Sequence, residues 1–120
     1  MTVTKVLLVD DEVEFASALS ERLRLRKYDA KAVYYAEDAL ATVRKDKPDV
    51  VLLDLKMPGM DGIEVLKSIK EFDPSIQVII LSGQGDREIA NEGIKAGAAD
   101  YVMKPVDIYE IITKIDQKYY

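Results

Sequence analysis

Aspartates end two apolar runs of the sequence, and a hydroxyl and an ammonium group follow two later runs. Asp10 and Asp11 come directly after the run 6–9, and Asp54 closes the run that starts at residue 50. The later pair is Ser82 and Lys104. Three carboxylates in one place repel one another unless a cation lies among them, and oxygen ligands without nitrogen or sulfur favour Mg²⁺. An ionised carboxylate can also attack phosphorus as a nucleophile, while Mg²⁺, a lysine and a hydroxyl neutralise the phosphoryl oxygens. These residue types therefore predict a phosphoryl-transfer site.

The same residues have simpler explanations when each is taken alone. Three pairs have the spacing of a helix capping box: Asp11 with Glu14, Asp61 with Glu64, and Asp107 with Glu110. We expect the second and third pairs to be caps. A cap at Asp11 would explain neither Asp10 nor Asp54, although a serine or a lysine at the end of a strand has no specific meaning by itself. The coincidence of these side chains at four strand ends favours the phosphoryl-transfer site.

Apolar runs of strand length recur along the chain. The runs 6–9, 50–53 and 76–81 are nearly continuous and rich in β-branched residues. Such runs are typical of parallel strands that are covered on both faces of a sheet. The segments 30–35 and 101–103 are more mixed or shorter, and we expect them to be edge strands.

The stretches between these runs have apolar residues at helical spacing. Four of the stretches are marked by Phe15, Leu19 and Leu23; by Ala39, Leu40 and Val43; by Ile63, Leu66 and Ile69; and by Ile108, Ile111, Ile112 and Ile115. The remaining one, 86–96, has a thin apolar face made of Ala90, Gly93 and Ile94, and the second helix begins near Tyr35 without a good N-cap. Five strand–helix repeats predict a doubly wound α/β fold of flavodoxin-like strand order 2-1-3-4-5. In that order strands one and three are neighbours, and their acidic ends share one crevice.

Composition limits the other functions that the chain could have. The 120 residues are 48 % hydrophobic and 32 % charged, which suits one soluble globular domain. Cysteine and histidine are both absent, which excludes disulfides, thiol catalysis and imidazole acid–base chemistry. A net charge of −5 argues against direct binding to nucleic acid. No apolar run is long enough to span a bilayer and we find no signal peptide, so we expect a cytoplasmic location.

Five sequence motifs, in order and at their usual spacing, resemble those of response-regulator receiver domains of two-component signal transduction, the CheY-like superfamily. The motifs are 8–12 (Leu-Val-Asp-Asp-Glu), 53–62 (Leu-Asp-Leu-Lys-Met-Pro-Gly-Met-Asp-Gly), 81–83 (Leu-Ser-Gly), 97–101 (Gly-Ala-Ala-Asp-Tyr) and 104–105 (Lys-Pro). The resemblance covers essentially the whole chain, 1–120. It departs from the family pattern at Gly83, where many relatives have alanine.

The resemblance implies a role for each residue of the site. It makes Asp54 the phosphoacceptor. Mg²⁺ is bound directly by Asp11, Asp54 and the backbone carbonyl of Lys56, and through water by Asp10. The phosphoryl oxygens are held by Ser82 and Lys104, Tyr101 is the switch aromatic, and the bond before Pro105 is cis.

The resemblance also implies partners and a signalling mechanism. A histidine kinase or a phosphotransfer protein donates the phosphoryl group, and the domain assists its own phosphorylation and dephosphorylation without being a classical enzyme. Movement of Ser82 toward the phosphoryl group lets Tyr101 turn inward and changes the surface of the fourth helix, fifth strand and fifth helix, around Lys95 and Tyr109. We hypothesise that this surface controls an output domain or downstream protein, through docking or a phosphorylation-dependent homodimer.

Three other readings of the sequence are less favoured. A phosphatase of the haloacid dehalogenase type would need a second aspartate two residues after Asp54, where this chain has Lys56. A flavodoxin-like FMN-binding protein would need a Ser/Thr/Gly-rich loop at 10–12, where the acidic residues would repel a phosphate. A pseudo-receiver that serves only as an interaction module does not explain why every acidic residue is present. Whether the chain is a stand-alone regulator or part of a longer transcription factor stays open.

Overall fold

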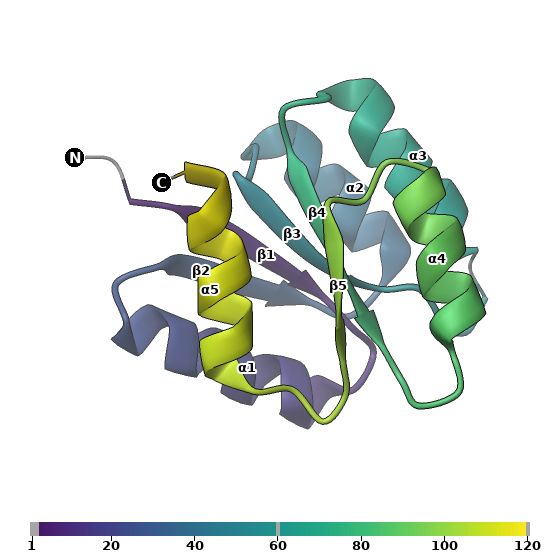
Figure 1. Ribbon diagram of the computed structural model, residues 1–120. Helices are drawn as coiled ribbons and strands as arrows, with labels where there is room; N and C mark the ends of the chain where they lie inside the picture. The colour runs from purple at the N-terminus through teal and green to yellow at the C-terminus, as the bar shows by residue number, and fades with distance from the viewer. Residues whose placement is uncertain (1–2, 60, 120) are drawn as a thin grey trace.

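The computed structural model describes residues 3–59 and 61–119 (Figure 1). Met60, which belongs to the second motif, lies outside the described residues. Within them, strands and helices alternate along the chain: β1 (Lys5–Val9), α1 (Val13–Leu25), β2 (Asp29–Val33), α2 (Ala36–Lys45), β3 (Val50–Asp54), α3 (Gly62–Phe72), β4 (Gln77–Ser82), α4 (Arg87–Lys95), β5 (Asp100–Met103) and α5 (Ile108–Tyr119). The strands form one parallel sheet in the order β2-β1-β3-β4-β5, which confirms the predicted flavodoxin-like α/β fold.

Helices cover both faces of the sheet, with α1 and α5 on one face and α2, α3 and α4 on the other (Figure 1). Successive strand residues point to opposite faces. In β1, Val6 and Leu8 therefore pack with the first helix pair, whereas Leu7 and Val9 pack with the other three helices. This double coverage explains why the central runs are nearly continuous in apolar residues, and why every residue of β3 is buried. The two mixed segments are the edge strands β2 and β5, as predicted.

The register of the sheet brings the carboxyl ends of its strands to one edge. Val9 pairs with Leu53, so the next residue on each strand, Asp10 and Asp54, stand side by side. On the other flank Ser82 pairs with Met103, which places Lys104 just beyond the end of β4. The strand register by itself therefore brings these residues together at the predicted crevice.

The helix ends follow the sequence in part. Asp61 caps α3, because its carboxylate accepts a hydrogen bond from the Ile63 amide at 3.0 Å. Asp107 accepts one from the Tyr109 amide at 2.9 Å, at the start of α5. Both caps were predicted. Asp11 does not cap α1: the N-cap residue there is Glu12, and no side chain caps the helix. The N-cap of α2 is Tyr35, also without a side-chain hydrogen bond. None of the described helices is long and apolar enough to cross a bilayer.

Two buried glycines let α3 and α4 lie close to neighbouring residues of the sheet and its loops. A Cβ at Gly62, the first residue of α3, would overlap the backbone of Leu55 just after β3. A Cβ at Gly93 in α4 would overlap the side chain of Ile80 in β4. The thin apolar face of α4 thus reflects close packing, since its buried residues are Ala90 and Gly93.

We expect Gly62→Ala to lower the free energy of unfolding by about 2–3 kcal/mol, because backbone atoms cannot move aside as a side chain can. Gly93→Ala should cost about 1 kcal/mol, since Ile80 can change rotamer and alanine favours the helix. Urea denaturation followed by circular dichroism measures both variants. A larger loss for Gly93→Ala than for Gly62→Ala would contradict this account.

Candidate functional site

Three acidic side chains gather at the carboxyl edge of the sheet. Asp10, Glu12 and Asp54 each offer a carboxylate oxygen, and these oxygens lie within 4.8 Å of one another. Asp10 is fully buried and Asp54 is 8 % exposed, whereas Glu12 is exposed. Asp11 is exposed and lies outside this group, because the chain turns outward after Asp10. Sequence reasoning grouped Asp11 with the other two aspartates and missed Glu12, whose only signal was its place beside the acidic pair.

Backbone amides hold the two buried carboxylates in place. Asp10 Oδ1 accepts a hydrogen bond from the amide of Glu12 at 3.0 Å. Asp54 Oδ1 accepts one from the amide of Lys56 at 2.9 Å. In both cases an aspartate at the end of a strand binds the amide two residues on, which is the geometry of an Asx-turn. Each carboxylate keeps its second oxygen, Oδ2, for other partners.

Lys104 supplies the positive charge of the site. Its Nζ lies 2.8 Å from Asp10 Oδ2, 2.6 Å from Glu12 Oε1 and 3.7 Å from Asp54 Oδ2. The ammonium group also lies 4.9 Å from the centre of the Phe15 ring. Burial lowers the pKa of Lys104, but its hydrogen bonds with Asp10 and Glu12 outweigh burial and hold that pKa above the ordinary value. The peptide bond from Lys104 to Pro105 is cis.

The Asp54 carboxylate is easier to protonate than an ordinary aspartate. Burial raises its pKa from 3.8 to about 6, against the opposing hydrogen bond from the Lys56 amide. The charges of Asp10 and Asp11 raise this pKa further, and Lys104 lowers it. Loss of hydration is therefore the main reason that Asp54 holds a proton more readily.

The acidic group fits a divalent cation with a preference for oxygen. Its donors are carboxylates, with no nitrogen or sulfur, which is the ligand set that Mg²⁺ prefers. Asp10 Oδ2 is buried, and its close partner among the described residues is the Lys104 ammonium group at 2.8 Å. A cation here would offset both the loss of hydration and the repulsion by Asp10 and Asp11 that raise the pKa of Asp54.

Ser82 and Tyr101 flank the acidic group from β4 and β5. Ser82 is buried, and its hydroxyl donates only long hydrogen bonds, of 3.4 Å each, to the carbonyls of Gly83 and Asp86. Tyr101 is half-buried and packs against the core beneath α2, α3 and α4. The Ser82 hydroxyl is thus weakly held where it could turn to a new acceptor.

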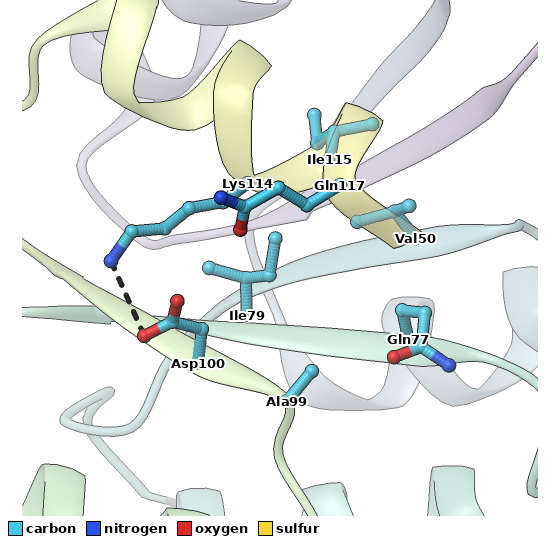
Figure 2. Close-up of a pocket in the computed structure, with 8 residues that line it drawn as sticks. All are labelled: Val50, Gln77, Ile79, Ala99, Asp100, Lys114, Ile115 and Gln117. Atoms are coloured by element: carbon cyan, nitrogen blue, oxygen red, sulfur yellow. Dashed lines mark ion pairs between the residues drawn. The ribbon is translucent and has the colours of Figure 1, made fainter. Parts of the chain in front are cut away.

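A cavity of about 170 Å³ lies at the opposite edge of the sheet, under α5 (Figure 2). There Lys114 forms an ion pair with Asp100 at 3.2 Å and donates a hydrogen bond to the Tyr101 carbonyl at 2.7 Å. Its ammonium group also lies 5.8 Å from the centre of the Tyr101 ring. Lys114 therefore fastens α5 to β5 beside Tyr101, and the cavity is separate from the acidic site.

Comparison with known protein families matches residues 6–116 to the response regulator receiver domain. The chain belongs to this family. Receiver domains are phosphoacceptors of two-component phosphorelays rather than classical enzymes, and an acidic cluster such as this one is typical of their Mg²⁺ site.

Individual relatives agree with this assignment. The receiver is 41 % identical to sporulation initiation phosphotransferase F of Bacillus subtilis, over 89 % of this chain and 86 % of the relative. It is 43 % identical to the transcriptional regulatory protein ZraR of Salmonella typhimurium, over 85 % of this chain but 23 % of that longer protein. The crystal structure of a CheY-like response regulator receiver domain protein from Methanospirillum hungatei superposes with a TM-score of 0.91 at 27 % identity, covering 98 % of this chain and 94 % of the other.

In Mg²⁺-free solution Asp54→Asn should raise the free energy of unfolding at pH 7 by about 1–2 kcal/mol, a figure reduced for partial solvent screening. A folded-state pKa of about 6 against an ordinary 3.8 means that ionised Asp54 destabilises the receiver above pH 6. The gain should shrink as the pH falls below 6 and vanish below 3.8, where Asp54 is protonated in both the folded and the unfolded wild type. Urea denaturation in EDTA at several pH values tests this, and a gain that grows on acidification would contradict it.

Proposed function

We propose that Asp54 accepts a phosphoryl group from a histidine kinase or a phosphotransfer protein. The observation that supports this proposal is the way the two oxygens of the Asp54 carboxylate are held. Its Oδ1 is fixed by the Lys56 amide at 2.9 Å, while Oδ2 faces Lys104 at 3.7 Å. Oδ2 would form the new bond to phosphorus as the P–N bond of phosphohistidine breaks, and the leaving imidazole keeps the electron pair and takes a proton from solvent. The nucleophile needs no general base, because it reacts as the carboxylate.

Mg²⁺ would be held by Asp54, by Asp11 and by the backbone carbonyl of Lys56, with Asp10 acting through water. When bound, it would neutralise the carboxylates and the phosphoryl oxygens. We keep Asp11 as the direct ligand in preference to Glu12, because Lys104 already engages Glu12 at 2.6 Å and Asp11 forms no ion pair with a described residue. Lys104 and Ser82 would then hold the phosphoryl oxygens.

The signal would leave the site through α4, β5 and α5. Ser82 would turn from its long hydrogen bonds toward the phosphoryl group, and Tyr101 would move into the space beneath α4. The altered surface would control an output domain or a downstream protein. Both arrangements occur among the relatives, since this chain spans 86 % of one and 23 % of another.

With Mg²⁺ and acetyl phosphate, the receiver should gain one base-labile phosphoryl group on Asp54, detected by intact mass and peptide mapping. Asp54→Ala should abolish this label, and omission of Mg²⁺ should slow labelling of the wild type by at least about tenfold, because charge neutralisation is then lost. Full labelling of Asp54→Ala at the wild-type rate would exclude Asp54 as the acceptor.

Removal of a direct Mg²⁺ ligand should weaken binding more than removal of a neighbour. Asp11→Ala should raise the dissociation constant for Mg²⁺ by about tenfold or more, as expected when one carboxylate leaves the coordination shell. Asp10→Ala should have a smaller effect. Glu12→Gln is the control, because it removes the charge of the third carboxylate of the acidic group. Titration followed by NMR shifts of the amides of 8–12 measures all three. A larger effect from Glu12→Gln than from Asp11→Ala would reassign the ligand.

A further inference from the structure

Asp86 stands at the N-cap position of α4 but does not cap the helix. Asp61 and Asp107 occupy the equivalent places before α3 and α5, and each accepts a hydrogen bond from the amide two residues on. Aspartate is among the residues that best cap a helix, so the failure of Asp86 to do so needs a cause. The cause is a competing partner.

The Asp86 carboxylate is engaged by Lys56, whose Nζ lies 2.6 Å from Asp86 Oδ1. This ion pair bridges the loop after β3 to the start of α4. The side chain of Asp86 is 20 % exposed and that of Lys56 is 58 % exposed, so solvent weakens the pair. Gly83 leaves room for the carboxylate, because a Cβ at this position would lie 3.0 Å from Asp86 Oδ2. The glycine that departs from the family pattern therefore faces the paired aspartate.

The backbone of Asp86 is connected to Ser82. Its carbonyl accepts the 3.4 Å hydrogen bond from the Ser82 hydroxyl, and its amide donates to the Gly83 carbonyl at 3.2 Å. The ψ angle of Asp86 is 22°, whereas the capping residue Asp61 has a ψ of 108°. Rotation of Asp86 toward a capping conformation would turn its carbonyl away from Ser82 and release the hydroxyl.

Lys56 is also connected to the phosphorylation site. Its amide donates to Asp54 Oδ1 at 2.9 Å, so its backbone is fixed next to the acceptor, while its largely exposed side chain reaches Asp86. A phosphoryl group on Asp54 carries roughly two negative charges against the one of Asp86. The phosphoryl group would therefore compete with Asp86 for the Lys56 ammonium group.

We propose that Asp86 exchanges between two partners, the Lys56 side chain and the free amides at the start of α4, and that phosphorylation drives the exchange by drawing Lys56 away. The proposal rests on the proposed function for its trigger, but the exchange itself is a property of the unphosphorylated receiver. Asp86 is a positioning residue: it holds the Ser82 loop in one arrangement and stabilises the first turn of α4 in the other. A weak, exposed ion pair suits this role, because a strong one would not be exchanged.

The first experiment uses the unphosphorylated receiver. Lys56→Met should free Asp86 to cap α4 and slow amide hydrogen exchange at Glu88 and Ile89 by about fivefold, the usual strength of an aspartate cap. Gly83→Ala should act in the same direction by displacing the carboxylate. Lys47→Met is the matched control, since it breaks an exposed ion pair with Asp73 at 2.8 Å, before β3 and β4 and so at the other edge of the sheet from the start of α4. The double variant Lys56→Met/Asp86→Ala should lose the added protection.

The second experiment adds Mg²⁺ and beryllofluoride, a phosphoryl mimic, with its binding at Asp54 followed by fluorine NMR. The wild type should gain protection at Glu88 and Ile89, and Lys56→Met should gain no more than it already has. The exchange would be overturned if the unphosphorylated double variant kept the slower amide exchange of Lys56→Met, or if Lys47→Met showed the same slowing. It would also be overturned if beryllofluoride slowed amide exchange further in both Lys56→Met and the double variant. Beryllofluoride bound at Asp54 with no change at these amides would overturn the coupling and leave the proposed function intact. Absence of beryllofluoride binding at Asp54 would instead refute the proposed function and with it the trigger, while the first experiment decides the exchange.

Discussion

Two carboxylates lie buried at the ends of strands whose central side chains are apolar, and one ammonium group faces both of them. Asp10 is fully buried and Asp54 nearly so, and Lys104 Nζ lies 2.8 Å and 3.7 Å from their Oδ2 atoms. Burial of an unpaired charge costs several kcal/mol, and Lys104 offsets part of this cost. The position of Lys104 depends on the pairing of Ser82 with Met103, which brings the end of the edge strand β5 beside the site. The packing of the sheet and the charge balance of the site therefore depend on each other.

The balance of charge at this edge of the sheet is incomplete. One lysine faces two buried aspartates and Glu12, and the pKa of Asp54 rises to about 6 because burial is not fully offset. A site that was neutral at rest would gain little from a cation or from a ligand rich in oxygen. The three carboxylates of the acidic group face one lysine, so binding of a cation there would be favourable. Binding of an anionic group together with a cation would be favourable for the same reason. The burial that makes ionised Asp54 unfavourable for stability would thus make cation binding favourable.

Much of the architecture could be predicted from the sequence, because double burial and helical spacing leave direct marks. The apolar run 50–53 predicts a central strand, and Asp61 and Asp107 predict helix caps from their places before apolar spacing. Side-chain direction at the turns could not be predicted. The sequence has acidic residues at 10–12, and only the turn after β1 decides that Asp10 points inward while Glu12, and not Asp11, meets Lys104. The partner of Asp86 was equally hidden, since Lys56 and Asp86 are brought together only by the meeting of two loops.

The small residues of α4 connect these features. Ala90 and Gly93 let the helix lie close to Ile80, but they bury little apolar surface, so α4 is held less firmly than helices with leucine and isoleucine faces. A weakly held element can be shifted by small free energies, such as a helix cap or a hydroxyl hydrogen bond. Both kinds of interaction involve the loop before α4. The Ser82 hydroxyl donates to the Asp86 carbonyl, and the Asp86 carboxylate forms an ion pair with Lys56. The thin apolar face of α4 would thus let a small change at this loop, such as the proposed release of Asp86 from Lys56, shift the helix.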